Sequence, residues 1–264
     1  MEPGGNILIA RVTQLRGKSF FLRKPYGAVA RFVSDALGYL LADVFPSLGL
    51  LLSLGLVAAA CTLYLFAGLA EEVYEGDTRQ FDESTLALVN GFASPSLTSF
   101  MRAVTYLGSV VFLTGAGACA VLVFVLARRR RAAVTLLVTM AGAALLNFTL
   151  KLVFGRERPE PFFNTPLPES YSFPSGHALL SFCFYGVIAA VIATRLKSVG
   201  SRVFVCVAAV LLVTLIGFSR IYLGVHFPSD VLAGYAAAFL WVVVVALADR
   251  VLQTRFRGRV EQSD

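Results

Sequence analysis

The chain has 264 residues, of which 57% are hydrophobic and 15% are charged, and its formal net charge is +7. Soluble domains carry about 25% charged residues, so this balance excludes a soluble or a disordered protein. Apolar residues indicate membrane spans when they form runs of about 17 to 25 residues, and the sequence contains several such runs.

The segment 1–45 precedes the first long apolar run. We expect no secretory signal here, because charges interrupt the segment and the apolar run begins too late. From Tyr26 to Phe45, apolar residues recur at helical spacing, while Arg31, Ser34 and Asp35 occupy other faces. This pattern predicts an interfacial, amphipathic helix within a cytoplasmic N-terminal segment.

Six apolar runs follow, and each predicts a transmembrane helix. The runs cover 46–70, 103–127, 132–150, 176–194, 203–218 and 231–248. Helices are expected because lipid-exposed backbone must satisfy its own hydrogen bonds, and no alternating pattern indicates a barrel. The predicted fold is an all-α integral membrane protein. Its six-helix domain covers 46–250, and a cytoplasmic tail covers 251–264.

Lys and Arg residues are distributed unequally among the loops. Seventeen of the 23 precede the first run, follow the sixth, or lie in the second-to-third and fourth-to-fifth loops. The segment between the first two runs carries six acidic residues against Arg79 and Arg102. Since positively charged loops stay in the cytoplasm, we expect both termini inside and this segment outside, in the inner membrane of a bacterial host. Topology thus explains the net charge, and no nucleic-acid partner is expected.

Polar residues that topology does not require gather at the outer ends of the predicted spans. The only two histidines both lie at helix starts, His177 after Pro174-Ser175-Gly176 and His226 before Pro228-Ser229-Asp230. The remaining cations on this side are Lys151, Arg156, Arg158 and Arg220. Helix N-termini and clustered cations favour a multivalent anion such as phosphate.

This set of side chains suits phosphoryl transfer. Such a reaction needs positive charge around the phosphate oxygens, an in-line nucleophile and an acid for the leaving oxygen. The two histidines can serve as nucleophile and acid. Asp230 follows His226 by four residues, so it can reach back one helical turn and fix the tautomer of that ring.

Three segments carry a family resemblance. They are K-x6-R-P at Lys151 to Pro159, P-S-G-H at Pro174 to His177, and S-R-x5-H-x3-D at Ser219 to Asp230. In this order they resemble the signature of the type 2 phosphatidic acid phosphatase (PAP2) family, over roughly 81–248.

The resemblance implies a role for each matched residue. His226 attacks phosphorus and becomes a phosphohistidine, Asp230 orients it, and His177 protonates the leaving oxygen. The phosphate is held by Lys151, Arg158, Arg220, the Ser175 hydroxyl and the Gly176 amide. The resemblance further implies that no metal or other cofactor is needed. Arg156 has no place in the pattern, and we interpret it as an ordinary loop or headgroup-facing arginine.

Other interpretations remain open from the sequence. The histidines and Asp230 suit a metal site or, less well, haem ligation. A phosphate or lipid transporter without hydrolysis also suits six spans, although ionisable residues at mid-membrane are scarce.

The substrate class follows from the position of the site. A site at the bilayer surface favours a lipid with a terminal phosphate, such as phosphatidic acid, phosphatidylglycerol phosphate or undecaprenyl pyrophosphate. The last two fit an outer-facing bacterial site best. The loop between the third and fourth predicted spans contains aromatic residues, which we expect to lie at the membrane interface or to line an entrance for the lipid tail. They are Phe162, Phe163, Tyr171 and Phe173.

Overall fold

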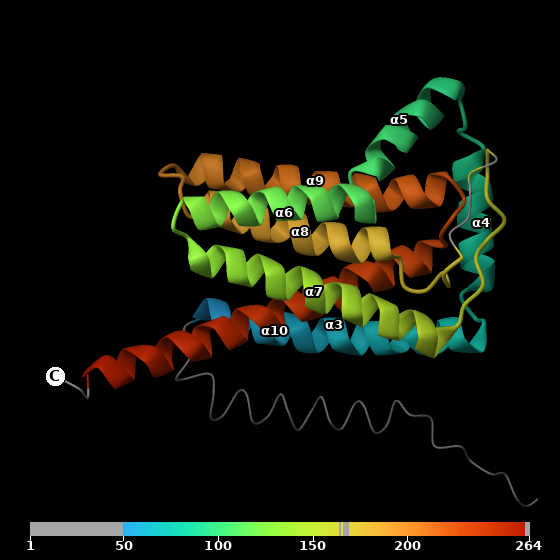
Figure 1. The fold of residues 1–264 in the computed structure, drawn as a ribbon. Helices are drawn as coiled ribbons and strands as arrows, with labels where there is room; N and C mark the ends of the chain where they lie inside the picture. Colours follow the sequence, from blue (N-terminus) through green and yellow to red (C-terminus); the bar gives the residue numbers. More distant parts are fainter. Residues whose placement is uncertain (1–49, 164, 166–168, 262–264) are drawn as a thin grey trace, which may run out of the picture. The chain divides into compact units, whose positions relative to one another are not determined.

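The computed structural model describes residues 50–163, 165 and 169–261, which belong to one unit, Leu48–Asp264. The segment 1–45 and its expected interfacial helix lie outside the described residues. Within them, every regular element is a helix (Figure 1). The helices are α3 (Leu50–Glu75), α4 (Arg79–Asn90), α5 (Pro95–Tyr106), α6 (Val110–Leu126), α7 (Arg130–Phe154), α8 (Gly176–Ala193), α9 (Val199–Tyr222) and α10 (Pro228–Glu261).

Five of these helices, α3, α7, α8, α9 and α10, are long and apolar enough to cross a membrane. A sixth span is present when α5 and α6 are taken together, because the two helices meet at a bend of 45°. The predicted all-α membrane fold is confirmed. The second apolar run, however, is a broken span rather than one continuous helix.

The break in the second run lies at Gly108, between α5 and α6. A Cβ atom at this position would lie 2.4 Å from Ile216 Cγ2 and 3.2 Å from His177 Cδ2. The Ser109 hydroxyl then accepts a hydrogen bond from Phe112 N (3.2 Å) and caps α6. Only a residue without a side chain permits this close approach of the chain to α9 and to the start of α8.

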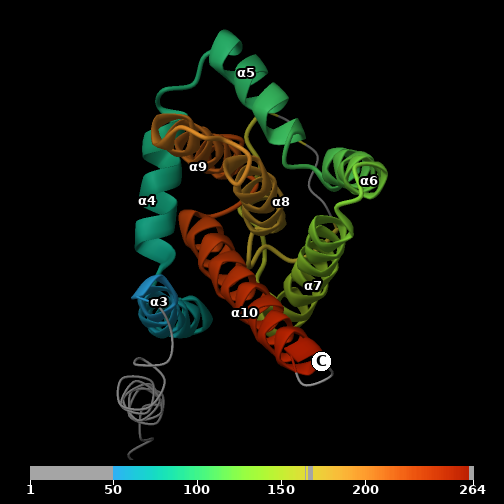
Figure 2. The same cartoon turned by 90° about the vertical axis from the view of Figure 1, so that its left-hand side faces the viewer.

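Helix α4 was not anticipated from the sequence. It runs across the end of the bundle between α3 and α9 (Figures 1 and 2) and contacts α9 and α10. Only two of its side chains, Asp82 and Leu86, are buried. A short, mostly polar helix with one buried carboxylate gives no signal of a membrane span, and its buried face becomes recognisable only once its packing partners are known.

Helix α8 is the central span (Figure 2). In its most apolar 18-residue window 44% of the residues are buried, against 11–33% for the other four single-helix spans. It contacts α6, α7, α9 and α10. A Cβ atom at Gly234 of α10 would lie 2.7 Å from Ser175 O, so this glycine allows the N-terminal ends of α8 and α10 to lie side by side.

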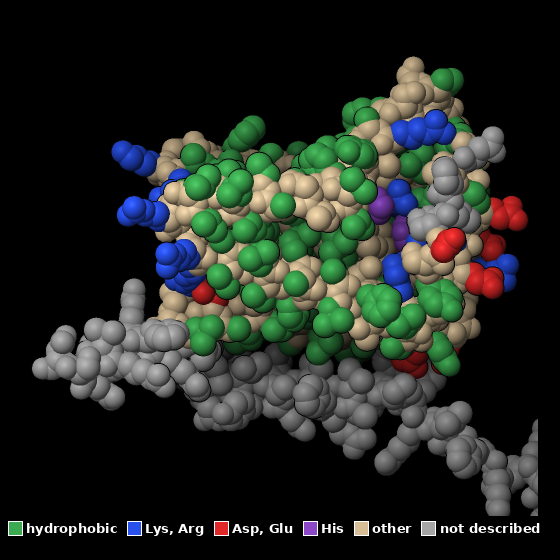
Figure 3. Space-filling model, in the orientation of Figure 1, with side chains coloured by type: hydrophobic (Ala, Val, Ile, Leu, Met, Phe, Trp, Pro, Cys, Tyr) green, Lys and Arg blue, Asp and Glu red, His purple; other side chains and the backbone are tan. Residues whose placement is uncertain are grey.

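Charge is concentrated at the two ends of the bundle. Figure 3 shows apolar side chains in the middle, basic ones at one end, and acidic, basic and histidine side chains at the end where α4 lies. Helix α10 continues without a break to Glu261, past the end of the last apolar run at residue 248.

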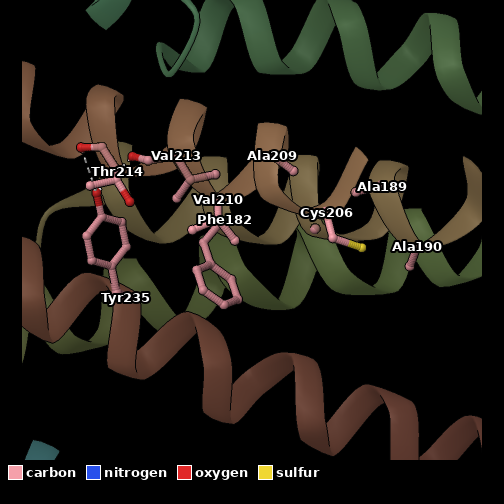
Figure 4. A pocket seen from close by; sticks show the side chains of 10 residues that line it. Phe182, Ala189, Ala190, Cys206, Ala209, Val210, Val213, Thr214 and Tyr235 are labelled. Carbon is pink, nitrogen blue, oxygen red and sulfur yellow. Dashed lines mark hydrogen bonds between the residues drawn. The ribbon is translucent and has the colours of Figure 1, made fainter. Parts of the chain in front are cut away.

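An apolar groove of about 380 Å³ lies between α8, α9 and α10 (Figure 4). Phe182, Cys206, Val210 and Tyr235 contribute to its lining, and the Tyr235 hydroxyl donates to Val213 O (2.8 Å). None of the catalytic or phosphate-binding residues that the sequence predicted lines this groove.

Candidate active site

The predicted site residues come together at the end of the bundle where α8 and α10 begin. Lys151 lies in the last turn of α7 and Arg220 in the last turn of α9. Arg158 lies in the α7–α8 loop and His226 in the α9–α10 connection. The remaining predicted residues are Ser175, Gly176 and His177 at the start of α8, and Asp230 in the first turn of α10.

His226 is held by Asp230. The ring Nδ1 lies 3.3 Å from Asp230 Oδ2, and the two side chains are 2% and 0% exposed. The same carboxylate oxygen accepts hydrogen bonds from Phe227 N (2.9 Å) and from the Ser172 hydroxyl. Since an ionised carboxylate only accepts hydrogen bonds, the Nδ1 of a neutral ring carries the proton and Nε2 keeps its lone pair.

The surroundings of His226 keep its ring neutral. Burial is the main cause that lowers its pKa, to about 3, and the charges of Arg158 and Arg220 act in the same direction against the contribution of Asp230. Nε2 lies 3.1 Å from a guanidinium nitrogen of Arg158. The lone pair of Nε2 is therefore available at neutral pH and points toward a cation, which is where a phosphate group would be attracted.

The cations are positioned by the loop between α7 and α8. Arg158 donates to Ser170 O (2.8 Å), Tyr171 O (3.2 Å) and, across the site, Val225 O (2.8 Å). Lys151 donates to the carbonyl oxygens of Tyr171 and Ser172. Partial burial lowers the pKa of Arg158. A desolvated guanidinium interacts more strongly with an anion than one in water does.

His177 belongs to the same electrostatic cluster. It interacts with Arg220, His226, Arg158 and Lys151. Its ring packs against Gly108 at the break between α5 and α6. It therefore lies beside the bent span formed by α5 and α6.

Unsatisfied polar atoms surround the start of α8. Ser175 Oγ, Arg220 Nε and Asn147 Oδ1 are buried and lack a hydrogen-bond partner. The nitrogen and oxygen of the Asn147 amide lie 3.2 and 3.4 Å from the position that a Cβ atom of Gly176 would take. Buried polar groups are normally paired, so these atoms are free to hydrogen-bond to a polar ligand.

Arg156 corrects the interpretation made from the sequence. It is not an ordinary loop arginine, because it bridges two buried carboxylates. One guanidinium nitrogen lies 2.7 Å from Asp82 Oδ2 and the other lies 2.7 Å from Asp230 Oδ1. The guanidinium also stacks on the Phe227 ring, 4.3 Å from its centroid.

The aromatic loop also differs from the expectation. Phe173 is fully buried and packs against Phe154, with 4.6 Å between ring centroids, while Phe163 stacks on Tyr222 at 5.6 Å. Tyr171 remains 45% exposed. Phe163 and Phe173 therefore anchor the loop to the bundle, which fixes the carbonyl groups that bind Lys151 and Arg158.

Several residues of the site were not predicted from the sequence. Ser172 lies outside the three motif segments, and Thr105, which accepts from Arg220 (2.9 Å), lies in the broken span. Asp82 was assigned only to the acidic outer segment. Asn147 had a usable signal, since it precedes Lys151 by one helical turn and therefore shares its face of α7.

The geometry does not favour a metal site at these histidines. Nδ1 of His226 already bonds to Asp230, and the positively charged Arg158 guanidinium lies 3.1 Å from Nε2, where it would repel a metal cation. Within the described residues, no cluster of three or more His, Cys, Asp or Glu side chains is arranged to hold a metal ion. The surrounding cations instead provide the positive charge that a phosphate group requires.

Comparison with known proteins identifies the family. The model of the PAP2 superfamily matches residues 132–252. Phosphatidylglycerophosphatase B of Bacillus subtilis is 31% identical over 206 residues, which is 75% of this chain and 98% of the relative. The undecaprenyl-diphosphatase of Sulfolobus acidocaldarius is 30% identical over 150 residues, which is 53% of this chain and 68% of the relative.

Solved structures support the same assignment. The crystal structure of a transmembrane PAP2-type phosphatidylglycerolphosphate phosphatase from Bacillus subtilis matches with a TM-score of 0.67 and 29% identity, covering 73% of this chain and 96% of that one. Aquifex aeolicus LpxE matches with a TM-score of 0.50 and 26% identity, covering 63% and 94%. Fold, motifs and sequence similarity thus agree: the chain belongs to the PAP2 superfamily and is a membrane phosphatase.

Proposed function

We propose that the protein hydrolyses the terminal phosphate of a membrane lipid phosphate or diphosphate through a phosphohistidine at His226. The observation that carries this proposal is the His226–Asp230 pair: one ring nitrogen bonds to a buried carboxylate, and the other faces Arg158. In the first half-reaction, Nε2 bonds to phosphorus as the bond to the lipid oxygen breaks. In the second half-reaction, water breaks the new N–P bond and releases phosphate.

His177 is the proposed acid and base of the two steps. It gives a proton to the departing lipid oxygen and later takes one from the attacking water, as reversal of the same step requires. For the first step it carries a proton that it has taken from the solvent or from the substrate. Its electrostatic interaction with Lys151, Arg158 and Arg220 supports a role beside the phosphate group.

Lys151, Arg158 and Arg220, with the Ser175 hydroxyl and the Gly176 amide, are the proposed phosphate ligands. The unpaired Ser175 Oγ and Arg220 Nε support this assignment. Charge on the phosphate oxygens is offset by cations already in place, so no metal ion is required for that purpose. We therefore expect activity to persist in EDTA.

The site is proposed to lie on the extracytoplasmic face of a bacterial inner membrane, with both termini in the cytoplasm. The basic residues of the α6–α7 and α8–α9 connections support this orientation, because they lie at the opposite end of the spans from the histidines. The proposed organisation is one six-span phosphatase domain at 46–250 between cytoplasmic segments 1–45 and 251–264.

The proposed substrates are phosphatidylglycerol phosphate, phosphatidic acid and undecaprenyl pyrophosphate. All three present a terminal phosphate at the depth of the lipid headgroups. The names of the two relatives support the first and the third of these lipids.

The experiment is phosphate release by the purified protein from each of the three lipids, with and without EDTA. We expect release from at least one lipid, unaffected by EDTA, and none from the His226→Ala variant. A wild-type protein that binds these lipids but releases no phosphate from any of them would instead support a transport or binding role.

A further inference from the structure

A chain of buried charges connects helix α4 to the proposed catalytic pair. Arg156 places one guanidinium nitrogen 2.7 Å from Asp82 Oδ2 and the other 2.7 Å from Asp230 Oδ1. The side chains of Asp82 and Asp230 are 0% exposed and that of Arg156 is 15% exposed. Asp82 precedes Asp230 by 148 positions in sequence, and Arg156 bonds directly to both carboxylates.

Asp82 also binds the first turn of α10. Its Oδ1 accepts from Ser229 N (3.0 Å) and its Oδ2 from the Ser229 hydroxyl (2.6 Å). The first N–H groups of a helix have no partner within the helix, and a carboxylate near them is favoured by the helix dipole. Asp82 thus caps α10 from another helix, one residue before Asp230.

The two oxygens of Asp230 have separate partners. Oδ1 bonds to Arg156, while Oδ2 faces His226 Nδ1 and accepts from Phe227 N and Ser172. Rotation of the carboxylate would break bonds at both oxygens. The direction of the hydrogen bond from His226 is therefore fixed by Arg156 as well as by Asp230.

A role in stability alone explains this network poorly. Buried ion pairs often stabilise a fold no more than well-packed apolar side chains would, because the charges lose their hydration. Helix α4 also carries the surface ion pair Arg79–Glu83, whose side chains are 80% and 56% exposed. The hydrogen bond of this pair joins Arg79 to Glu83 and does not involve Asp230. Helix α4 thus carries one exposed pair and one buried carboxylate that reaches the site through Arg156.

We propose that Arg156 and Asp82 are positioning residues, which hold the Asp230 carboxylate so that Oδ2 orients His226 for attack. This inference rests on the proposed role of the His226–Asp230 pair. It makes α4, which lies outside the membrane spans, part of the catalytic apparatus. Neither residue touches the reacting atoms, and both act through Asp230.

The test uses the double variant Asp82→Asn/Arg156→Gln. It removes one negative and one positive charge, so the net charge of the buried group stays the same and Asp82 is not left as a buried carboxylate without its cation. The matched control is Arg79→Gln/Glu83→Gln, which makes the same change on the exposed face of α4. Both are assayed on the lipid phosphate that the wild type turns over fastest, and folding is compared by thermal unfolding in detergent.

We expect kcat of the buried double variant to fall about 10- to 100-fold, the loss typical of partners that orient a functional ligand. KM should change less than about twofold, because the phosphate ligands are untouched. The exposed double variant should match the wild type. A wild-type kcat in a folded Asp82→Asn/Arg156→Gln protein would overturn the inference.

A mutant cycle shows whether the effect passes through Asp230. In the Asp230→Asn background the buried double substitution should reduce kcat by less than about twofold, because the residue it positions is already altered. A full additional loss would mean that Arg156 acts elsewhere and would overturn the inference. If Asp230→Asn itself kept the wild-type rate, the proposed mechanism would fall as well, so the two failures are distinguishable.

The single variant Arg156→Lys provides a test that keeps the charge in place. A lysine cannot donate two parallel bonds to two carboxylates as a guanidinium does. We expect a reduced kcat and, in ¹⁵N spectra, a mixture of His226 tautomers. An Arg156→Lys protein with the wild-type kcat and a single Nδ1–H tautomer would contradict the bridging role.

Discussion

At the scale of single residues, the two histidines differ in what surrounds them. His226 is fixed at Nδ1 by a buried carboxylate and is itself almost fully buried. His177 is only partly buried and packs against Gly108 beside the bent span. The proposed nucleophile is thus the more constrained ring, and the proposed acid is the less buried one.

The first prediction concerns the protonation of His226. Burial disfavours the charged ring and lowers its pKa to about 3, so the ring should bind a second proton only well below its ordinary value of about 6.5. The chain has only two histidines, so His177→Asn leaves a single ring to observe. In ¹⁵N-histidine spectra of that variant, we expect a neutral Nδ1–H ring down to pH about 4. Titration near pH 6.5 would show that the ring is solvated.

The second prediction separates the roles of the two histidines by leaving group. A lipid alkoxide needs a proton to depart, whereas p-nitrophenolate departs largely unaided. His177→Ala should therefore lose most activity on lipid phosphate and retain part of it on p-nitrophenyl phosphate, provided the wild type accepts that ester. His226→Ala should be inactive on both. The reverse pattern would exchange the two roles.

At the scale of helices, contacts at glycine positions determine how closely two neighbouring spans can pack against each other. A Cβ atom at Gly142 of α7 would lie 1.9 Å from Cζ2 of Trp241 in α10. The indole also donates to Thr139 O (2.9 Å), so the ring cannot move away without losing that bond. Gly142 therefore controls the spacing of α7 and α10, which carry Lys151 and Asp230.

The third prediction follows from this contact. Gly142→Ala gains up to about 1 kcal/mol in helix propensity but forces an overlap with a rigid ring, which costs about 1–3 kcal/mol. We expect a lower Tm in detergent. The control is Gly115→Ala in α6, where no atom lies within 4 Å of the added Cβ, and which should keep or raise the Tm. Equal Tm values for the two variants would show that the α7–α10 contact relaxes freely.

Helices also show what the sequence can and cannot predict. The long apolar runs predicted the spans, because burial in lipid imposes a length and a composition. The matched segments predicted Lys151, Arg158, His177, His226 and Asp230, because each lies at a helix end or in the connection next to it, on one side. The pairing of Asp82 with Arg156 depends on how α4 crosses the bundle, which is a tertiary fact with no local pattern. The break at Gly108 is likewise set by Ile216 and His177.

At the scale of the whole molecule, charge separates the two ends of the spans. The basic α6–α7 and α8–α9 connections lie at one end, and the acidic α4 and the site lie at the other. By the positive-inside rule, this asymmetry predicts that the site faces away from the cytoplasm.

The fourth prediction tests the orientation in intact cells. The four cysteines are replaced by alanine first, because all of them lie within the spans, including α6 of the bent span. They are Cys61, Cys119, Cys183 and Cys206. Arg79→Cys on α4 should then react with an impermeant thiol reagent, while Arg195→Cys in the exposed α8–α9 connection should react only after lysis. Labelling of Arg195→Cys alone in intact cells would place the active site in the cytoplasm.

The central claim is that phosphate passes through His226, and trapping that intermediate tests it most directly. His177→Ala should form the intermediate from p-nitrophenyl phosphate but hydrolyse it slowly, because the base that activates water is missing. Intact-protein mass spectrometry after a rapid alkaline quench should show the mass of one added phosphoryl group, and peptide mapping should place it on His226. The His177→Ala/His226→Ala protein should show none. Turnover of the ester by His177→Ala with no phosphorylated protein at any time, or a phosphoryl group mapped to another residue, would contradict the account.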